Sequence, residues 1–349
     1  MSDGVGIDEE RPSVTVVVVV YGEEPLLENC INAITGSVGI IPEVVIVENG
    51  GSEEIIATLE VRHRLRVIRP GRNTGFAEGC NLGVSAGSVS FVALVNPDAI
   101  VEPTALRELV RGANHPDGRV VTASIRLAHR PEIINSSGTE ITFLGLSWAA
   151  HFGEVALSGD APRFVAGANG GALACRRSTW DTLGGLCSEM FVYYEDADFS
   201  IRAWHRGIPV VFIPSAVTLH AYEFSKNKGK FFFLERNRLM SVLTCFELKH
   251  LLVTLPMHVV IECGLIAFAT REGWLGEKLR AYRWVLANLQ WIRHRRTALQ
   301  QVRVADMGAF YDVLSTGMFP GNLPSAHPPM IVNRIMAGYW NIARRIIGR

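Results

Sequence analysis

Val14-Thr-Val-Val-Val-Val-Val20 is the stretch that decides the fold. It is far too short to cross a bilayer, which requires about 20 apolar residues. A continuous run of β-branched side chains is typical of a strand that is buried on both faces. Strands of this kind occur in parallel sheets covered by helices, so the run predicts the first strand of an open α/β sheet.

The residues that follow alternate between helical and strand-like patterns. Helices are expected at 24–34 and after the turn-forming Asn-Gly-Gly-Ser sequence at 49–52. Strands are expected at 43–48, 65–68 and 89–95. This β-α-β-α order predicts an open, mostly parallel sheet. The stretch from 112 to 162 has only a weak pattern, typical of loops and short antiparallel strands.

A glycine-spaced helix is expected at 74–86, where Gly75, Gly79 and Gly83 recur every fourth residue on one face. Close packing of that face against the sheet is the favoured interpretation, and contact with a ligand is the alternative.

The composition sets the class of protein. The 349 residues are 48% apolar and 19% charged, which is enough for one large domain with an appendage, or for two domains. Disordered, collagen-like, coiled-coil and disulfide-scaffold classes do not fit. The six cysteines show no CxxC spacing and no histidines at zinc-site intervals, so reduced, buried thiols are expected.

A net charge of zero conceals two unlike halves. Residues 1–223 hold 16 Arg, no Lys and 27 acidic residues, a balance of −11, and residues 224–349 carry +11. The basic half suits an anionic lipid surface, and because it is also apolar, nucleic acid is not expected as a partner. Residues 1–12 are polar and acidic, unlike a signal peptide, so we expect a flexible tail and a cytoplasmic protein.

The C-terminal third combines helical periods with basic and aromatic side chains. Helices are expected at 231–246 and 274–303, and the second of these mixes tryptophans with Lys278, Arg280, Arg283, Arg293, Arg295, Arg296 and Arg303. Such a mixture suits a lipid headgroup interface.

Residues 251–270 have the length of a transmembrane helix, but they include Pro256, His258 and Glu262, and a carboxylate at mid-bilayer is costly. An interfacial or re-entrant element is therefore favoured over a span. Residues 331–349 predict a last basic helix, which either lies on a membrane or docks on the catalytic domain.

Polar side chains follow three of the predicted strands. They are Tyr21 after the first strand, Glu48-Asn49 after the second and Asn96-Pro97-Asp98 after the fourth. Ligands collect beyond the carboxyl ends of parallel strands, so three such sets indicate a nucleotide pocket, although a single carboxylate there is more often a helix cap. Asp98 could hold Mg²⁺ or Mn²⁺ against a diphosphate, and Asn-Pro-Asp is also a common turn.

Phe191-Val-Tyr-Tyr-Glu-Asp-Ala-Asp-Phe-Ser-Ile-Arg202 is the most specific stretch. Helix N-termini attract acids, but three carboxylates among aromatic side chains should also raise at least one pKa, as a general base requires. Arg202 lies four residues after Asp198 and could hold it in an ion pair. That leaves Asp196 or Glu195 as the base.

Two further segments flank this stretch. Residues 165–173 are glycine-rich, which permits either close approach of a substrate or a tight turn. Residues 210–214 are strand-like and lead to His220, which is either structural or a metal ligand.

Together these segments resemble the family 2 glycosyltransferases of GT-A fold, and within them the bacterial rhamnosyltransferase-like branch. The resemblance covers residues 13–245 and runs in family order through 16–21, 45–52, Asn73-Thr-Gly-Phe-Ala77 with Asn81, Leu94-Val-Asn-Pro-Asp-Ala99, 167–177, Gly184-Gly185, 191–202, 214–220 and Arg236-Asn-Arg-Leu239.

The basic and aromatic composition of the C-terminal third predicts a helical membrane-associating region at 246–349. The resemblance implies that a GT-A catalytic domain, a Rossmann-like open mixed sheet, precedes it at 13–245. It also implies Mg²⁺ or Mn²⁺ and a nucleotide-diphosphate sugar, with dTDP-rhamnose favoured and UDP-sugars as alternatives. The implied site residues are Tyr21, Glu48, Asn73, Gly75 and Asn96 at the nucleotide, Asp98 and His220 at the metal, and Asp196 with Glu195 as the catalytic Glu-Asp pair.

The implied reaction is an inverting transfer to a hydroxyl of a lipid-linked or cell-envelope glycan at the inner face of the cell membrane. Three residues or segments depart from the family pattern. Glu48 replaces Asp, and Asn96 stands at the first aspartate of the family's metal-binding DxD motif. Leu186-Cys-Ser-Glu189 replaces Phe-Asp-Glu.

Two alternative functions fit the sequence less well: a sugar nucleotidyltransferase and an inactive membrane scaffold. A sugar nucleotidyltransferase would need a basic, glycine-rich loop after the first strand, which residues 21–25 do not provide. A catalytically inactive membrane scaffold would have no need of Asp98, Asp196 and His220.

Overall fold

The computed structural model describes residues 11–157, 159, 161–221, 229–303, 306–321 and 326–347. The expected tail at 1–12 lies outside the described residues, apart from Arg11 and Pro12, which are exposed.

The strands, in chain order, are β1 (Ser13–Val20), β2 (Ile41–Glu48), β3 (Arg66–Ile68), β4 (Phe91–Val95), β5 (Ala99–Val101), β6 (Val120–Leu127), β7 (Arg130–Ser136), β8 (Thr139–Ile141), β9 (Ser147–Ala149), β10 (Arg163–Phe164), β11 (Ala172–Arg176) and β12 (Val210–His220). The helices are α1 (Leu27–Thr35), α2 (Glu53–His63), α3 (Gly75–Ala86), α4 (Ala105–Ala113), α5 (Arg177–Leu183), α6 (Glu195–His205), α7 (Lys230–Cys245), α8 (Leu248–Glu272), α9 (Leu275–Ala287), α10 (Leu289–Gln301), α11 (Gly308–Val313) and α12 (Met330–Ile347).

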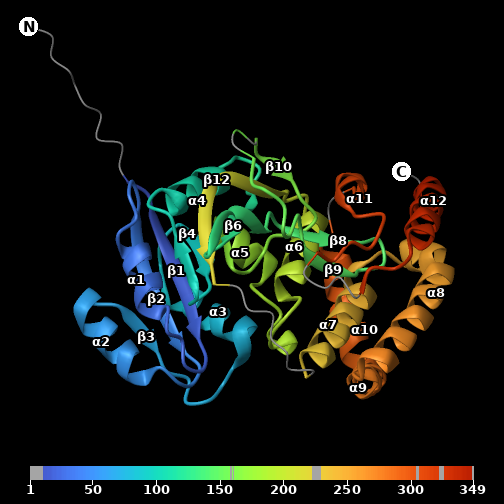
Figure 1. Ribbon diagram of the computed structural model, residues 1–349, viewed down its shortest axis with the longest axis horizontal. Coiled ribbons are helices and arrows are strands. Elements are labelled where there is room, and N and C mark those ends of the chain that lie inside the picture. Colours follow the sequence, from blue (N-terminus) through green and yellow to red (C-terminus); the bar gives the residue numbers. More distant parts are fainter. Residues whose placement is uncertain are drawn as a thin grey trace, which may run out of the picture.

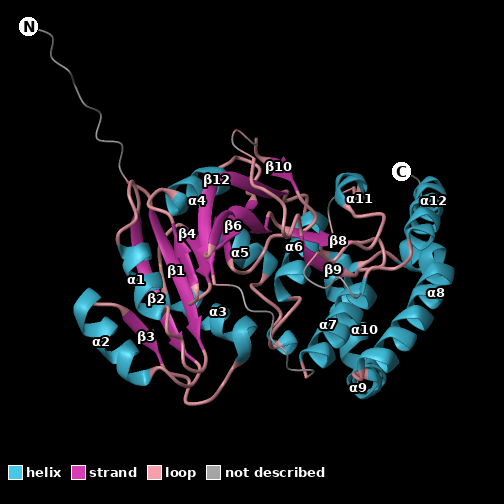
Figure 2. Ribbon diagram, in the orientation of Figure 1, coloured by secondary structure: helices cyan, strands magenta, loops and turns pink. Residues whose placement is uncertain are grey.

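One mixed sheet organises the part of the chain from β1 to β12 (Figures 1 and 2). Its strand order is β10-β12-β6-β11-β4-β1-β2-β3, with β5 added beside β12 and β7 beside β6. Strands β3, β2, β1 and β4 are parallel, and β11 enters antiparallel between β4 and β6. The carboxyl ends of β1, β2 and β4 therefore lie along one edge, where the polar residues that follow them meet.

The first strand is buried on both faces, as its sequence predicts. Val16 and Val18 pack with residues of α1 and α4, such as Leu27 and Leu106. Val17 and Val19 belong to the core on the opposite face, with α3, α5 and α6. Full burial of a valine side chain is worth roughly 1.5 to 3 kcal/mol, so this strand anchors both layers.

The glycine face of α3 packs against that strand. A Cβ added at Gly79 would lie 2.9 Å from Val19 Cγ1, and one at Gly83 would lie 2.3 Å from Val17 Cγ1. Glycine at these two positions lets the helix approach the sheet, in agreement with the favoured interpretation. The weakly patterned stretch from 112 to 162 forms β6, β7 and the separate β8–β9 pair.

The C-terminal helices share a hydrophobic core with the part of the chain that forms the sheet. Phe246, Met257 and Trp340 lie in the same cluster as Phe199 of α6, and α7 packs against α9 and α10. The helical stretch expected at 274–303 is interrupted at Asn288, whose side-chain amide donates to the Trp284 carbonyl (2.8 Å) and ends α9.

Four of the seven basic residues expected at a headgroup interface instead face the protein. Lys278 is fully buried between two carboxylates, Arg295 pairs with Asp198, and Arg303 pairs with Glu247. Arg296 donates to the carbonyls of residues 243 and 246. The prediction of a lipid headgroup interface is wrong for these four side chains. They form ion pairs or hydrogen bonds with carboxylates and backbone carbonyls of the segments that pack against them.

Candidate active site

The turn after β4 brings Asp98 against His220, although 122 residues separate them. Strand β5 continues from this turn and pairs with the end of β12, where His220 lies opposite Ala99. His220 Nε2 lies 3.0 Å from Asp98 Oδ1, and its Nδ1 lies 3.0 Å from Asn135 Oδ1. The strand pairing therefore fixes the imidazole and the carboxylate side by side.

This pair fits a divalent cation. With Nδ1–H donating to the Asn135 oxygen, the lone pair of His220 Nε2 points toward Asp98. Two octahedral ligands at about 2.1 Å from Mg²⁺ or Mn²⁺ lie roughly 3 Å apart, which matches the observed separation. The described residues hold no cluster of three or more potential His, Cys, Asp or Glu ligands, so phosphate oxygens and water would complete the shell.

The base candidates lie in the first turn of α6. Asp196 Oδ2 accepts from the Gly170 amide (2.8 Å), and its Oδ1 accepts from the Ala197 amide (2.7 Å). Burial raises the pKa of Asp196, and these two amides oppose the rise. Burial, and then the charge of Asp196, raise the pKa of Glu195 well above its usual range. Asp196 is therefore the carboxylate of this pair whose negative form is stabilised by the amides of two other residues.

Asp198, by contrast, is locked in ion pairs. Burial alone would raise its pKa, but Arg295 and Arg202 hold the pKa well below its usual range. Arg202 Nε lies 2.8 Å from Asp198 Oδ2, as the four-residue spacing predicts. Ser241 also donates to this carboxylate. Asp198 therefore supports the helix and is not available as a base.

The loop before α6 has unusual backbone geometry. Phe191, Tyr193 and Tyr194 all have positive φ, between 65° and 72°. A side chain in this region costs of order 1–3 kcal/mol, and such strain persists only when neighbours enforce it.

Two residues of α7 hold this loop in place. The Asn237 amide nitrogen lies within 3.0 Å of the carbonyl oxygens of residues 190, 192 and 193. Arg236 Nη2 donates to the carbonyls of residues 189 and 190. The sequence shows the Arg236-Asn-Arg-Leu239 segment but does not predict that it acts as a clamp on the loop at 191–194. We call this loop the catalytic loop because it leads directly to the base candidates of α6.

The expected nucleotide residues lie at the neighbouring strand ends. Tyr21 is 67% exposed directly after β1, and Glu48 ends β2 with Arg69 Nε 3.7 Å away. Asn73 Oδ1 accepts from the Gly75 amide (2.8 Å). Gly75 has φ +78°, and a Cβ there would lie 2.5 Å from the Phe191 carbonyl oxygen, so this glycine is required where α3 meets the catalytic loop.

Asn49, one of the polar residues expected at the strand ends, organises this edge of the sheet. It is buried, and its amide nitrogen donates to the Gly75 carbonyl (2.9 Å), while its oxygen accepts from the Thr74 hydroxyl (2.8 Å). These bonds fasten the end of β2 to the start of α3.

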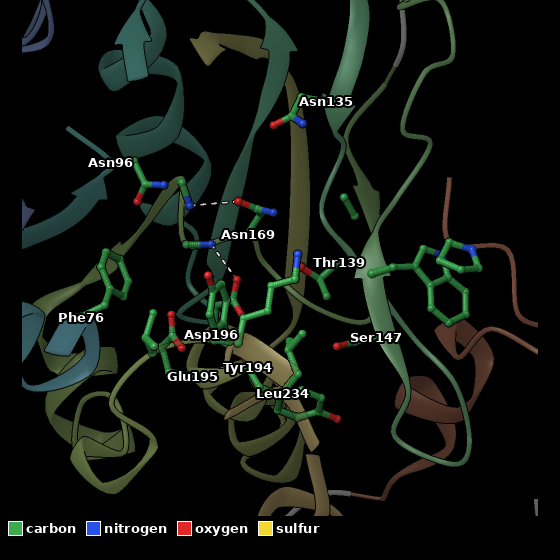
Figure 3. A pocket seen from close by; sticks show the side chains of 18 of the residues that line it. Phe76, Asn96, Asn135, Thr139, Ser147, Asn169, Tyr194, Glu195, Asp196 and Leu234 are labelled. Carbon is green, nitrogen blue, oxygen red and sulfur yellow. Dashed lines mark hydrogen bonds between the residues drawn. The ribbon is translucent and has the colours of Figure 1, made fainter. Parts of the chain in front are cut away.

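A cavity of about 420 Å³ joins the two chemical centres; His220, Asn96, Asp196 and Glu195 all line it. Figure 3 shows Asn96 and Phe76 on one side and Thr139 and Ser147 on the other, with Asp196 between them. The second side is built by β8, β9 and the start of α7, which contributes Lys230, Phe231 and Leu234. A two-sided cavity with a carboxylate between the sides suits the transfer of a group from one ligand to another.

Comparison with known sequences agrees with this geometry. The family described as glycosyltransferase like family 2 matches residues 12–242. An N-acetylglucosaminyl-diphospho-decaprenol L-rhamnosyltransferase of Mycobacterium tuberculosis is 26% identical over 234 residues, which is 59% of this chain and 75% of the relative. A low-salt glycan biosynthesis hexosyltransferase of Haloferax volcanii is 26% identical over 205 residues, 56% of this chain and 63% of the relative.

Solved structures share the fold. GalNAc-T7, solved with UDP, GalNAc and Mn²⁺, superposes with a TM-score of 0.57 at 16% identity over 68% of this chain, which spans 48% of that chain. The mannosyltransferase PcManGT of Pyrobaculum calidifontis, solved with GDP-Man and Mn²⁺, superposes with a TM-score of 0.51 at 15% identity, over 97% of this chain and 87% of that one. The chain belongs to the glycosyltransferase like family 2, and it is a glycosyltransferase of GT-A fold.

Proposed function

We propose that this glycosyltransferase is metal-dependent and inverting, and that it transfers rhamnose from dTDP-rhamnose to a hydroxyl of a lipid-linked or cell-envelope glycan at the inner face of the cell membrane. The observation that carries the proposal is the shared cavity, because both His220 and Asp196 line it. His220 in turn contacts Asp98. The rhamnosyltransferase relative, which is named for a polyprenyl-diphosphate-linked sugar, supports the choice of donor and acceptor.

On the donor side, the strand-end residues bind the nucleotide sugar. Tyr21, Glu48 and Asn73 contact the nucleotide at the carboxyl ends of the parallel strands, where such ligands collect. Asp98 and His220 would hold Mn²⁺ or Mg²⁺, which when bound would neutralise the charge that develops on the departing diphosphate. Asn96 lines the cavity beside them.

On the acceptor side, Asp196 acts as the general base. Its carboxylate removes the proton from an acceptor hydroxyl, and that oxygen attacks C1 of the sugar on the face opposite the diphosphate, which inverts the anomeric centre. The amides of Gly170 and Ala197 fix the orientation of the carboxylate. Burial of Asp196 raises the pKa of its carboxyl group, which favours proton uptake during the reaction.

The experiment that tests the proposal is a thermal-shift panel on the purified full chain. The panel contains dTDP-rhamnose, UDP-galactofuranose, UDP-glucose and GDP-mannose, each with and without Mn²⁺. We expect the largest stabilisation with dTDP-rhamnose plus Mn²⁺. A larger shift with another nucleotide sugar would reassign the donor, and equal shifts with and without Mn²⁺ would refute metal dependence.

A further inference from the structure

Helix α8 presents an apolar face to the outside. It is the one helix among the described residues that is long and apolar enough to cross a membrane. Its outward side chains include Leu252, Val259 and Val260, which are 62%, 55% and 62% exposed. Leu248, Leu255 and Ile266 are exposed on the same helix. An apolar surface of this extent is unusual on a monomeric soluble protein and marks an interaction site.

Helix α12 extends this surface. It lies alongside α8 at the end of the molecule far from β3 (Figure 1), and Tyr339 Oη donates to the Val253 carbonyl at 2.6 Å. Met336 and Trp340 face inward and are buried. Its outward side is again apolar, and we define the α8–α12 face as the exposed residues Leu248, Leu252, Leu255, Val259, Val260, Ile266, Met330, Ile331, Ile335, Ile342 and Ile346.

The inner side of α8 is tied to the protein along its length, which argues against a span. His250 is fully buried, and its Nε2 donates to the Phe143 carbonyl (2.7 Å). Near the other end, Glu262 Oε2 lies 2.9 Å from Lys278 Nζ, and Glu262 also pairs with Arg238. A spanning helix would carry these charges into the hydrocarbon, whereas a helix lying flat leaves them inside the fold.

The charges around the face fit anionic lipid. Arg334 and Arg345 are exposed on α12 beside the isoleucines, and neither α12 nor α8 before Glu262 contains an acidic residue. Two copies of this chain joined by a two-fold axis would bring the same basic surfaces together, which is unfavourable. Apolar residues flanked by arginine are the composition of helices that lie in a membrane interface.

An exposed apolar side chain also lies beside the cavity. Pro320 lines the cavity, and the adjacent Phe319 is 55% exposed. Docking on the bilayer would let a lipid-linked acceptor keep its lipid chain in the membrane while its sugar enters the cavity. We propose that the α8–α12 face is a docking surface that lies flat in the interface of an anionic bilayer, a proposal that rests on the lipid-linked acceptor class above.

The test is flotation of the full chain with vesicles of phosphatidylcholine, alone or mixed with phosphatidylglycerol. We expect binding to the mixed vesicles that weakens in high salt. The double variants Leu252→Glu/Val259→Glu and Ile335→Glu/Ile342→Glu should each lower the partition coefficient at least about tenfold, because each removes two apolar side chains from the bilayer. Val61→Glu is the matched control, since Val61 is 81% exposed on α2, away from the face.

Three results would overturn this proposal: equal binding by the double variants, no binding by the unmodified chain, or a dimer in solution that the double variants dissociate. The last result would assign the face to a second copy. Thermal shifts with nucleotide sugars, measured on the same variants, separate this proposal from the proposed function. Failure of the unmodified chain to respond to any donor would count against the function and leave the flotation result intact.

The flat orientation has its own test. Lys249 and Arg271 are exposed near the two ends of α8, and Lys249→Cys and Arg271→Cys can be made in a Cys263→Ser background. When the protein is added to sealed vesicles, a membrane-impermeant maleimide should label both positions. Protection of one end alone would show that α8 crosses the bilayer.

Discussion

Arg295 Nη2 lies 2.7 Å from Asp198 Oδ2, so a helix of the C-terminal region forms a buried ion pair with the helix that carries the proposed base. Asp198 is only two residues from Asp196. Because Arg202 and Arg295 share this carboxylate from α6 and α10, a C-terminal helix helps to hold the helix that carries the proposed base.

Replacing Arg295 by Met should destabilise the protein severely. Removal of one partner from a buried ion pair typically costs about 3–5 kcal/mol when the other charge is left uncompensated, and because Arg202 still pairs with Asp198, we expect a loss near the lower end of this range. Chemical denaturation of the full chain measures the change in the free energy of unfolding. Arg293→Met is the control, since Arg293 is exposed on the same helix. A similar small effect of both substitutions would contradict the assigned role of the pair.

Asp196→Asn should abolish transfer while the donor still binds. Loss of a general base typically lowers the rate by about 10² to 10⁴. Because burial raises the pKa of Asp196, the rate of the unmodified enzyme should fall with decreasing pH at a value above that of an ordinary aspartate. Initial rates and donor titrations measure the two effects, and Asp181→Asn, on the exposed side of α5, is the control. Loss of donor affinity with surviving turnover would reverse the assignment.

Asp98→Asn and His220→Ala should each weaken the response to Mn²⁺. Each removes a proposed metal ligand, so the thermal shift produced by donor plus Mn²⁺ should shrink toward that produced by donor alone. Asp117→Asn, at an exposed position, serves as the matched substitution. An undiminished Mn²⁺-dependent shift in both variants would place the metal elsewhere.

Asn237→Asp tests the clamp on the catalytic loop. The substitution keeps the shape of the side chain but replaces an amide donor with a carboxylate facing three carbonyl oxygens. We expect kcat to fall about tenfold or more, as the loop relaxes from its strained geometry, with donor affinity at the strand ends unchanged. Asn32→Asp is the control, since Asn32 is exposed on α1. Equal losses of kcat and donor affinity would indicate general unfolding instead of loss of positioning.

Buried neutral histidines should make stability depend on pH. Burial lowers the pKa of His205 to about 3 and those of His250 and His258 to about 4. As the pH falls below about 6.5, these histidines take up protons in the unfolded chain while they stay neutral in the folded protein. The free energy of unfolding is therefore greatest above about pH 6.5 and decreases at lower pH, by up to about 1.4 kcal/mol per pH unit for each histidine. Unfolding free energies measured between pH 7 and 5 should show this slope. His250→Gln should reduce it and exposed His294→Gln should not.

Local pattern predicted much of the fold. The valine run from 14 to 20 indicates a strand that is buried on both faces. Successive side chains of a strand point to opposite faces, so when both faces are covered, nearly every residue must be apolar. The pairing of Asp198 with Arg202 follows from helical spacing. Arg295 could not be inferred in the same way, since it lies 97 residues from Asp198 and reaches it through the packing of α10 on α7. The clamp by Asn237 depends on where loop carbonyls point, which no local periodicity encodes.

The division of charge along the chain becomes a division in space. The acidic N-terminal half and the basic C-terminal half lie toward opposite ends of the long axis (Figure 1), so their formal charges give the molecule an electric dipole along that axis. Near a negatively charged surface this dipole experiences a torque before any contact is made. The protein would then arrive with its helical end first, and the rate of arrival should decrease as added salt shortens the Debye length.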